Sequence, residues 1–463
     1  MKSKFTLCVV LVGLVAVGGP VYAELCTIDD VPAATLLLPY FEVDINDDDE
    51  DGILNCADPD DRGVTTLFSV NNASAAAQLT HFVLWTDWTV PTLDFDVYLT
   101  GYDVQTVNMC DIFRGRLPRT ADRSRDAGDA FSPSPPIGAT QAAPPWDADF
   151  PGCAGRFPFN EVELNSEQID HIRRGHTGLS SPIYFGNCLG ANYSDGIARG
   201  YLTVDNVNRC SLEFPGDGGY FVQGGTGTAN NNNVLWGNYH YVDAANNFAQ
   251  GETLVHIEAD AALTEATVND TFYSRFTTIG EDNREPLATT FAARYITAGA
   301  FTGGTDLVVW REGGIPDFNG FTCGAVPLWH PLNQAQVVAF DEEENGTEIC
   351  IPGEDRVSPP TGEAQTCFPN ETQRVPVGQD SPVPGGDDVS PVDDIGGWLY
   401  LNLNYDLSAA AGGTGTSAFP DPKQAWVTTL FSALGRFSTG MDAIQLDSAC
   451  TTEAEGVIID PIP

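Results

Sequence analysis

The sequence predicts an all-β protein of antiparallel architecture, arranged as one large β-sandwich or as two packed sandwiches, with long loop insertions and one short helix. Short segments alternate between apolar and polar residues, as half-buried strands do. They are rich in Val, Thr, Phe, Tyr and Trp, and clusters of Gly, Asn, Asp and Pro separate them. The 463 residues include 47 Gly and 31 Pro, and this turn-rich composition favours antiparallel sheets over βαβ units.

The clearest strand prediction covers residues 92–100. Successive residues of a strand point to opposite faces, so one face of this segment is apolar and the other carries Asp94 and Asp96. Residues 253–260 alternate in the same way, with His256 and Glu258 on one face. Further strands are predicted at 64–70, 81–85, 200–204, 307–310, 336–340, 398–403, 426–431 and 443–446.

One helix is predicted after Asn165. Asn165 can cap the helix, Gln168 can return the hydrogen bond as the partner of a capping box, and Gly175 is expected to end it. We interpret it as an isolated structural helix on a β protein.

The first residues have the pattern of an export signal. Lys2 and Lys4 precede the apolar stretch 5–17, and Val21-Tyr22-Ala23 offers small residues for cleavage after Ala23. The apolar stretch is shorter than the roughly 20 residues that span a bilayer. We therefore expect a secreted protein, extracellular or periplasmic, that does not insert into a membrane.

The chain is divided by composition. We predict six regions, which are the signal peptide 1–23, an N-terminal β region 24–118, an insertion rich in Pro, Asp and Arg at 119–155, a central β region with the helix at 156–340, an acidic Pro-rich insertion 341–394, and C-terminal strands 395–463. Thr65–Ser69 and Thr428–Ser432 both read TTLFS, which is suggestive of related strands but too short to establish a repeat.

The charge of the chain limits its partners. The net charge is −43, and cleavage of the signal removes Lys2 and Lys4 as well. Such a surface repels nucleic acid, whose binding needs basic side chains to neutralise phosphates. It suits calcium or a cationic partner, although acidity can also serve solubility alone. Five arginines between 114 and 125 form a basic strip that either docks onto a neighbouring copy or offsets nearby aspartates.

The cysteines predict a disulfide framework. Of 11 cysteines, Cys8 lies in the signal, and the even number left suggests disulfides in an oxidising compartment. Cys350 and Cys367 bracket a Pro/Gly-rich stretch and are predicted to pair. A zinc site is disfavoured because the sequence contains no C-x-x-C.

The strongest local motif is the acidic segment Asp47–Asp58, which contains D-x-D-x-D-G. Calcium takes about six to eight oxygen ligands from flexible loops of this kind. The segment resembles the calcium loops of EF-hands, dockerins and thrombospondin type 3 repeats, and the resemblance covers these 12 residues alone. It departs from the EF-hand in ending on an aspartate and in lacking flanking helices. The alternative is a solvated acidic loop. The ligands that the resemblance implies are Asp47, Asp49, Asp51, the carbonyl of Ile53, Asn55 and Asp58.

Catalytic signatures are weak. Asp94 with Asp96 fits the spacing of a glycosidase pair, and His256 with Glu258 fits an acid–base or metal pair, but a solvated strand face shows the same pattern. The sequence contains no nucleophile elbow, no P-loop and no H-E-x-x-H. Trp85, Trp88 and Trp146 are candidates for stacking sugars if they are exposed.

Together these patterns favour a secreted, disulfide-stabilised, calcium-binding protein with a non-catalytic structural or adhesive role outside the cell. Its expected partners are further copies of itself or an extracellular polysaccharide. The alternatives are a secreted carbohydrate-binding protein and a hydrolase that acts on glycans.

Overall fold

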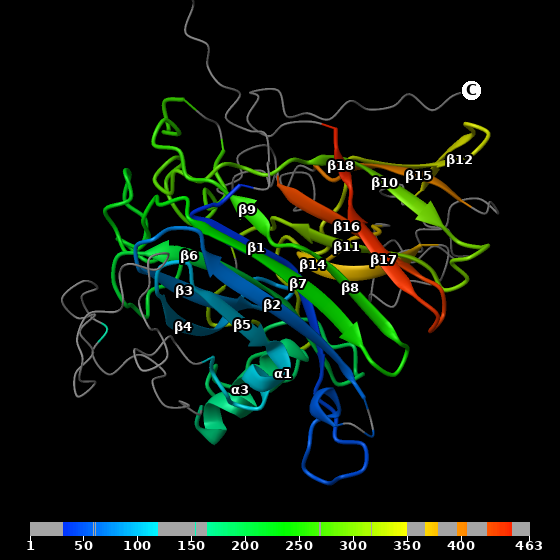
Figure 1. Ribbon diagram of the computed structural model, residues 1–463, viewed down its shortest axis with the longest axis horizontal. Coiled ribbons are helices and arrows are strands. Elements are labelled where there is room, and N and C mark those ends of the chain that lie inside the picture. The colour runs from blue at the N-terminus through cyan, green and yellow to red at the C-terminus, as the bar shows by residue number, and fades with distance from the viewer. Residues whose placement is uncertain are drawn as a thin grey trace, which may run out of the picture.

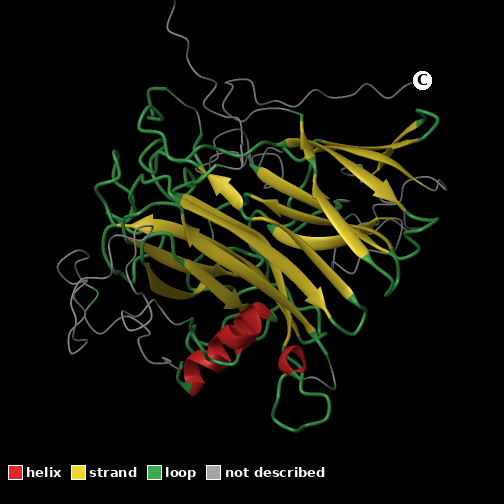
Figure 2. Cartoon of the chain, viewed as in Figure 1, coloured by secondary structure: helices red, strands yellow, loops and turns green. Residues whose placement is uncertain are grey.

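The structure, a computed structural model, confirms the all-β prediction (Figures 1 and 2). It describes residues 31–58, 60, 62–118, 153, 164–267, 270–315, 317–349, 366–377, 396–404 and 424–446. The export signal and most of the two predicted insertions lie outside these residues, so the predicted cleavage site and division into regions stay predictions. Within the described ranges, no helix is long and apolar enough to cross a membrane.

The first half of the described chain forms one sandwich of two antiparallel sheets. Their strand orders are β4-β3-β6-β1-β9 and β5-β2-β7-β8. The strands are β1 (Thr35–Asp44), β2 (Val64–Asn72), β3 (Gln78–Trp85), β4 (Pro91–Leu99), β5 (Val104–Asn108), β6 (Ile197–Val207), β7 (Leu235–Asp243), β8 (Phe248–Thr253) and β9 (Val255–Ile257). Two helices, α1 (Met109–Phe113) and α3 (Ser166–His176), pack beside this sandwich (Figure 2).

The second half forms another sandwich, so the two-sandwich alternative describes the molecule. Its sheets have the orders β13-β12-β15-β10-β18 and β14-β11-β16-β17. The strands are β10 (Thr290–Ile296), β11 (Gly304–Arg311), β12 (Gln336–Asp341), β13 (Gly346–Ile349), β14 (Thr372–Val377), β15 (Gly396–Asn402), β16 (Ala425–Ser432), β17 (Ser438–Asp442) and β18 (Ile444–Gln445). In Figure 1 the first sandwich lies at the lower left and the five-stranded sheet of the second at the upper right.

The two sandwiches repeat one topology. Raising every strand number of the first sandwich by nine gives the strand order of both sheets of the second, and this accounts for every strand among the described residues. The β1 strand therefore corresponds to β10, β2 to β11, and so on through β9 and β18. Connections of different length join these strands in the two sandwiches, which hides the repeat from inspection of the sequence.

Individual residues follow the repeat. Thr35 pairs with Asp205, and Thr290 pairs with Asn402 in the equivalent strands. Five residues before each of these partners stands a glycine, at Gly200 and Gly397. A Cβ on Gly200 would lie 2.1 Å from the carbonyl oxygen of the β3 residue Trp85, and a Cβ on Gly397 would lie 1.8 Å from that of the β12 residue Phe340.

The aromatic residues beside these glycines also correspond. Tyr201 stacks on Trp85 with the ring planes 10° apart, and Trp398 stacks on Phe340 with the ring planes 13° apart. In both sandwiches, the residue before the stacked aromatic residue is therefore glycine, because a side chain there would collide with the backbone of the neighbouring strand.

A cross-sheet bond is repeated as well. The Thr66 hydroxyl accepts the N–H of Glu42 at 3.1 Å and donates to its carbonyl oxygen at 3.2 Å. The Thr305 hydroxyl makes the same two bonds to Ile296, both at 2.8 Å. Thr66 and Thr305 occupy equivalent places on β2 and β11, so the internal repeat extends to hydrogen bonding.

The TTLFS echo does not mark this repeat. Thr65–Ser69 lies in β2 and Thr428–Ser432 lies in β16. The strand equivalent to β16 is β7, so the two segments occupy different places in their sandwiches.

A third core joins the sandwiches. It lies between the outer face of the β4-β3-β6-β1-β9 sheet and the outer face of the β14-β11-β16-β17 sheet, and we call it the junction core. It includes Leu37, Val83, Trp85, Tyr201, Val255 and Ile257 from the first sandwich, Trp310 and Trp426 from the second, and Phe272, Tyr273 and Leu287 from the segment 258–289 between them. The β4-β3-β6-β1-β9 sheet is thus covered on both faces.

Strands form in both segments 92–100 and 253–260, as β4 and β9, but this double covering changes the expected surroundings of their polar residues. The polar face expected at residues 94–96 is partly buried, because Asp96 lies in the interior and accepts a hydrogen bond at 2.8 Å from Nδ1 of the β3 residue His81. In the segment 253–260, neither face of β9 is exposed to solvent, because Val255, His256 and Ile257 are all buried. Alternation indicates a strand, but it does not reveal whether a second layer covers the polar side.

The helix prediction is confirmed. The Asn165 side chain accepts the N–H groups of Glu167 and Gln168, and the Gln168 side chain returns a bond to the N–H of Asn165. The helix ends one residue later than expected, at His176.

Disulfides tie the described parts together, as expected for an extracellular or periplasmic protein. The bridges are Cys56–Cys110, Cys153–Cys210 and Cys188–Cys323, and the last one joins the two sandwiches. Cys367 is also disulfide-bonded. Cys350 lies outside the described residues, so the Cys350–Cys367 pair stays a prediction.

Candidate metal site and buried junction

The acidic loop joins β1 to β2 and projects from the end of the first sandwich, at the bottom of Figure 1. Its far end is fixed by the Cys56–Cys110 bridge to the start of α1. The N–H of Gly63 also donates to the carbonyl oxygen of Asn55 at 2.8 Å. The loop is thus exposed at its tip and anchored at its base.

Three carboxylates meet at the tip. Asp47, Asp49 and Asp51 each place an oxygen within 4.8 Å of the others. Each also accepts a backbone N–H, from Gly52 at 3.0 Å, Asp51 at 3.1 Å and Ile53 at 2.7 Å, respectively. Gly52 has a φ of +88°, a conformation that favours glycine.

One oxygen in this cluster is left without a partner. Oδ1 of Asp47 is shielded from solvent and makes no hydrogen bond within the described residues. Three like charges at this separation repel one another, and a bound cation would offset the repulsion and satisfy that oxygen.

The other predicted ligands have different roles. The Asn55 amide donates to Asp44 at 3.2 Å and to Asp48 at 3.1 Å, and its oxygen accepts the N–H of Asp48. Asn55 therefore holds the loop in shape. Asp58 is buried, accepts the N–H of Asp60 at 2.7 Å, and does not belong to the cluster. Ile53 is exposed beside the carboxylates. The structure thus brings together three of the six residues.

The two catalytic candidates among the strands are not arranged as open acid–base pairs. Asp96 is engaged by His81, as described above. Nε2 of His256 accepts the N–H of Gly237 at 3.4 Å within the first sandwich. Of the arginine strip, Arg114 pairs with Asp111 at 3.4 Å and Arg116 is exposed, while Arg119, Arg123 and Arg125 lie outside the described residues.

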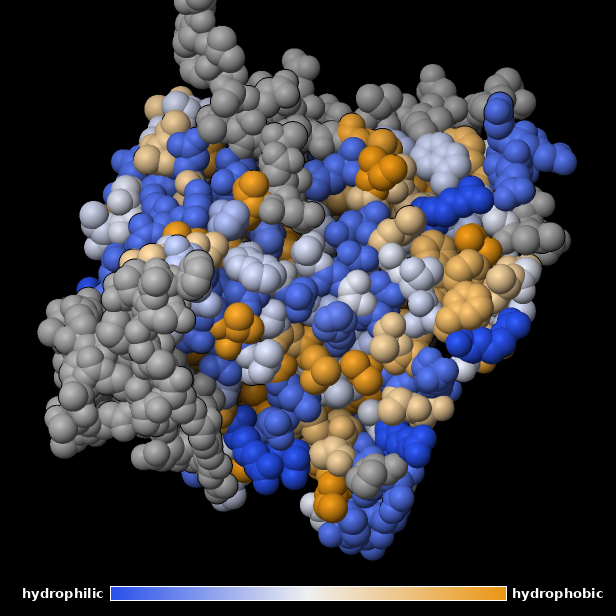
Figure 3. All heavy atoms as spheres, in the orientation of Figure 1, coloured by the Kyte–Doolittle hydropathy of each residue, from blue (hydrophilic) through white to orange (hydrophobic). Residues whose placement is uncertain are grey.

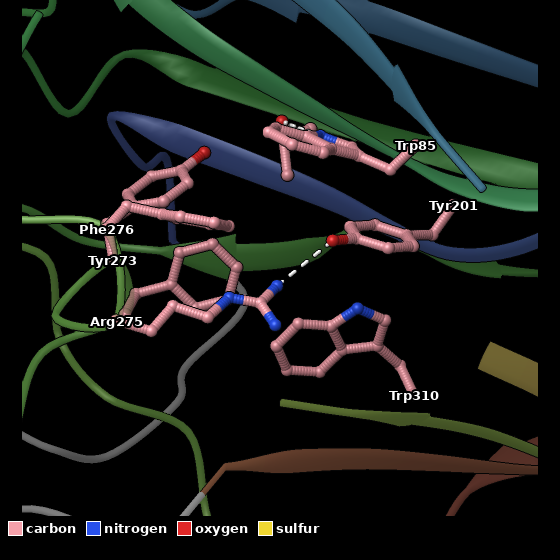
Figure 4. A pocket seen from close by; sticks show the side chains of 8 residues that line it. Trp85, Tyr201, Tyr273, Arg275, Phe276 and Trp310 are labelled. Carbon is pink, nitrogen blue, oxygen red and sulfur yellow. Dashed lines mark hydrogen bonds between the residues drawn. The ribbon is translucent and has the colours of Figure 1, made fainter. Parts of the chain in front are cut away.

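A narrow cavity lies in the junction between the sandwiches (Figure 4). Trp85, Tyr201, Phe276 and Trp310 surround it, and the Arg275 guanidinium reaches into it and donates to the Tyr201 hydroxyl at 3.0 Å. The cavity has room for about one water molecule, so no sugar ring fits there.

Buried charges adjoin this cavity. Arg275 pairs with Glu371 at 2.8 Å and approaches Glu312 at 3.9 Å, and all three are almost fully buried. Glu371 also accepts the Thr89 hydroxyl, and Glu312 accepts the Gln424 amide at 2.7 Å. Burial raises the pKa of both carboxyl groups, and Asp270 raises that of Glu312 further.

The residues of this charge network come from three different parts of the chain. Thr89 and Tyr201 come from the first sandwich, Glu312 and Glu371 from the second, and Arg275 from the segment between them. The network therefore fastens three parts of the chain. Sequence reasoning missed it, because the charges stand far apart in the chain and only the stacking of sheets brings them together.

Trp85 and Trp88, which were candidates for stacking sugars only if exposed, are both buried, so neither offers a sugar platform. Trp85 lies in the junction core, and Trp88 packs against Trp329 and Leu332. Trp146 lies outside the described residues.

Asp87 is a further buried carboxylate beside the junction. It lies between β3 and β4 and accepts the N–H of Ala191 at 3.1 Å and the Tyr193 hydroxyl at 3.3 Å. Burial raises its pKa from 3.8 to about 7. A carboxyl group with a raised folded-state pKa contributes less to stability as the pH rises from the unfolded pKa to the folded one.

We therefore expect Asp87→Asn to change the pH dependence of stability. The variant cannot ionise at this position, so between pH 4.5 and 7.5 its stability relative to the wild type should rise, by about 2–4 kcal/mol. Urea unfolding at the two pH values measures the difference. If the two proteins differed in unfolding free energy by the same amount at both pH values, the raised pKa would not belong to Asp87.

No protein-family model, no curated protein and no solved structure matches this chain.

Proposed function

We propose that the mature protein is a secreted, disulfide-stabilised β protein that binds calcium at the Asp47–Asp58 loop and has a non-catalytic structural or adhesive role outside the cytoplasm. The observation that carries the proposal is the convergence of Asp47, Asp49 and Asp51, where one oxygen of Asp47 has no hydrogen-bond partner among the described residues. Hard oxygen ligands on an anchored, glycine-containing turn are what calcium requires.

The proposed ligands are the three carboxylates, with the Ile53 carbonyl oxygen and solvent completing the shell. Asn55 and the Cys56–Cys110 bridge hold the loop in place from its base. The export pattern at residues 1–23 supports a compartment in which calcium is plentiful and disulfides persist.

The structural role is supported by the way the rest of the molecule is built. Its buried carboxylates at the junction are enclosed by aromatic rings and engaged by Arg275, Thr89 and Gln424. Two stacked sandwiches joined by a disulfide and a third core form a stiff body of the kind that suits a scaffold.

Calcium is expected to raise the melting temperature of the metal-free protein. A ligand present at 100 times its dissociation constant adds about 2.7 kcal/mol to the folded state. Asp49→Asn should abolish the effect, because it removes one ligand charge while keeping the bond to the N–H of Asp51. The measurement is thermal unfolding in 0.15 M NaCl, with chelator, calcium or magnesium added in turn.

Glu50→Gln is the matched control. It removes one charge from the same loop, but Glu50 does not belong to the carboxylate cluster. A calcium response that survives in Asp49→Asn, or that disappears equally in Glu50→Gln, would show that the loop attracts cations only through its general charge. If chelation leaves the wild-type melting temperature unmoved, the calcium proposal fails.

A further inference from the structure

The turn between β3 and β4 reaches from the first sandwich to the second. Residues 86–90 form this turn, which we call the β3–β4 turn, and the N–H of Thr86 closes it by donating to the carbonyl oxygen of Val90 at 3.0 Å. Thr89 within it has a φ of +57°, a conformation that residues with a branched side chain rarely adopt. The surrounding contacts must therefore hold the turn in this strained shape.

Three residues of the turn contact the chain just before β14 of the second sandwich. The carbonyl oxygen of Asp87 accepts the N–H of Glu371 at 3.1 Å, and the Thr89 hydroxyl donates to the Glu371 carboxylate. Nε1 of Trp88 donates to Oδ1 of Asn370 at 3.2 Å. The β3–β4 turn thus fastens the two sandwiches to each other beside the junction core.

The Asp87 carboxyl group is held inside this turn with little to balance a charge. It accepts the two hydrogen bonds described above, from Ala191 and Tyr193. Arg199 is the cation that acts on it, but Arg199 already pairs with Asp195 at 2.6 Å. Its guanidinium group also lies over the Tyr193 ring, 4.6 Å from the ring centre. An ionised Asp87 is therefore poorly compensated while the turn is closed.

The Glu371 carboxyl group lies among an excess of acidic groups. Arg275 serves both Glu371 and Glu312, so one buried guanidinium group offsets two buried carboxyl groups. Asp270 adds a further negative charge that acts on Glu312. If Glu371 and Glu312 both ionise, Arg275 cannot balance them, and this weakens the same fastening that ionisation of Asp87 weakens.

The other titratable groups of the described chain that face these carboxyl groups keep one protonation state between pH 5.5 and 8.5. Burial lowers the pKa of His330, whose ring packs against the turn, to about 4, so this imidazole stays neutral. Burial raises the pKa of the Tyr193 and Tyr201 hydroxyls above their usual value, so both stay protonated. Arg199 and Arg275 stay charged, as guanidinium groups do in proteins. The carboxyl groups therefore determine the response to pH.

Surface groups differ from these carboxyl groups in their access to water. Over the face of the molecule drawn in Figure 3, hydrophilic and hydrophobic side chains are interspersed, and the hydrophilic ones are open to solvent. Asp87 and Glu371 are 3% and 0% exposed, so they reach water only if the β3–β4 turn moves outward. Ionisation of Asp87 and movement of the turn are therefore coupled.

We propose that the β3–β4 turn is a pH-dependent clasp, which fastens the second sandwich to the first below neutral pH and loosens as Asp87 loses its proton. Opening of the turn hydrates the Asp87 carboxylate and breaks the bonds of Trp88 and Thr89 to the second sandwich. The Cys188–Cys323 bridge stays intact, so the sandwiches remain linked but gain freedom to move at their junction. This device goes beyond the proposed function and does not depend on the calcium loop.

The expected size of the response follows from Asp87. Its pKa is about 7 in the closed turn and returns towards 3.8 when the turn opens. Because the folded-state pKa is raised, the contribution of Asp87 to closure is largest in acid and is lost as the pH rises through 7. Closure is therefore disfavoured by about 30-fold at pH 8.5 relative to pH 5.5.

Hydrogen exchange followed by mass spectrometry measures this opening, once each rate is corrected for intrinsic exchange at that pH. The informative amides are those of Glu371 and Ala191, which donate to Asp87 in the closed turn. In the wild type, with chelator present, we expect their protection to fall by about 30-fold from pH 5.5 to pH 8.5. Their exchange should be insensitive to low concentrations of urea, as local opening is, whereas amides of the central strand β6 should respond to urea.

Three variants identify the group that controls the turn. Asp87→Asn should keep both amides protected at the two pH values, because an amide side chain cannot ionise. Tyr193→Phe should move the midpoint to higher pH, because it removes a hydroxyl that stabilises the Asp87 carboxylate. The control, Glu265→Gln, removes an exposed carboxylate from the segment 258–289 and should behave as the wild type does.

The proposal fails if the protection of the two amides in the wild type is the same at pH 5.5 and pH 8.5. It also fails if these amides show the same urea dependence as β6, because the turn would then open only when the whole protein unfolds. If Asp87→Asn leaves the turn unprotected at both pH values, Tyr193→Phe decides the question. An unchanged midpoint in Tyr193→Phe would show that a group other than Asp87 controls the turn.

Discussion

Replacing Arg275 by methionine should destabilise the protein by about 3–5 kcal/mol. Methionine fills much of the volume of arginine, but it leaves Glu371 and Glu312 buried without their cation. It also removes the donor to the Tyr201 hydroxyl. The cost should be smaller at pH 5 than at pH 8, because burial already raises the pKa of both carboxyl groups and protonation removes the unpaired charge.

Arg294→Met is the matched control. Arg294 pairs with Glu342 on the surface at 3.2 Å, and both side chains are largely exposed, so its loss should change stability by less than about 0.5 kcal/mol. Adding Glu371→Gln and Glu312→Gln to Arg275→Met should recover part of the lost stability. Chemical unfolding measures all four proteins. A loss below about 1 kcal/mol in Arg275→Met would mean that the network does not hold the junction together.

Removing the Cys188–Cys323 bridge with the double variant Cys188→Ser, Cys323→Ser should cost a comparable amount, about 3–5 kcal/mol. The bridge closes a sequence separation of 135 residues and links the two sandwiches. A short backbone pairing of Cys188 with Phe321 stands beside it. Without the bridge, we expect the sandwiches to unfold in two calorimetric steps, because the described part of the junction is then held by noncovalent contacts.

Removal of the Cys56–Cys110 bridge is the control for removal of the Cys188–Cys323 bridge. It closes a separation of 54 residues within the first sandwich, and its loss should lower the stability of that sandwich without splitting the transition. If the variant without Cys188 and Cys323 melts in one step at the wild-type temperature, the bridge is dispensable for the junction.

Local patterns in the sequence predicted local structure well. The capping box at Asn165 depends on residues within one turn, and the structure contains it. The convergence of Asp47, Asp49 and Asp51 depends on five consecutive residues, and it also forms. Asn55 was expected to join them, but Asp44 at the end of β1 and Asp48 engage its amide instead. That outcome depends on the position of Asp44 at the end of β1, which local sequence patterns do not specify.

The stacking of layers could not be predicted from periodicity. An alternating strand such as 92–100 has one apolar face. The alternation does not indicate whether its polar face is exposed to solvent or, as for Asp96, contacts a buried histidine. The repeat was hidden for a similar reason. Gly200 and Gly397 correspond only once the register of four strands is known, whereas the more conspicuous TTLFS echo joins strands that are not equivalent.

The bulge in β1 has a consequence for folding fidelity. Between Leu38 and Phe41 the pairing of β1 with β6 shifts by one residue, whereas β10 pairs with β15 without a shift. A chain with two equivalent sandwiches risks placing β10 in the site of β1 as it folds. The bulge lies in β1 and has no counterpart in the pairing of β10 with β15. Within it, the carbonyl oxygen of Pro39 accepts the Thr372 hydroxyl, and that of Tyr40 accepts the Tyr241 hydroxyl. The bulge therefore distinguishes the correct strand from its own duplicate.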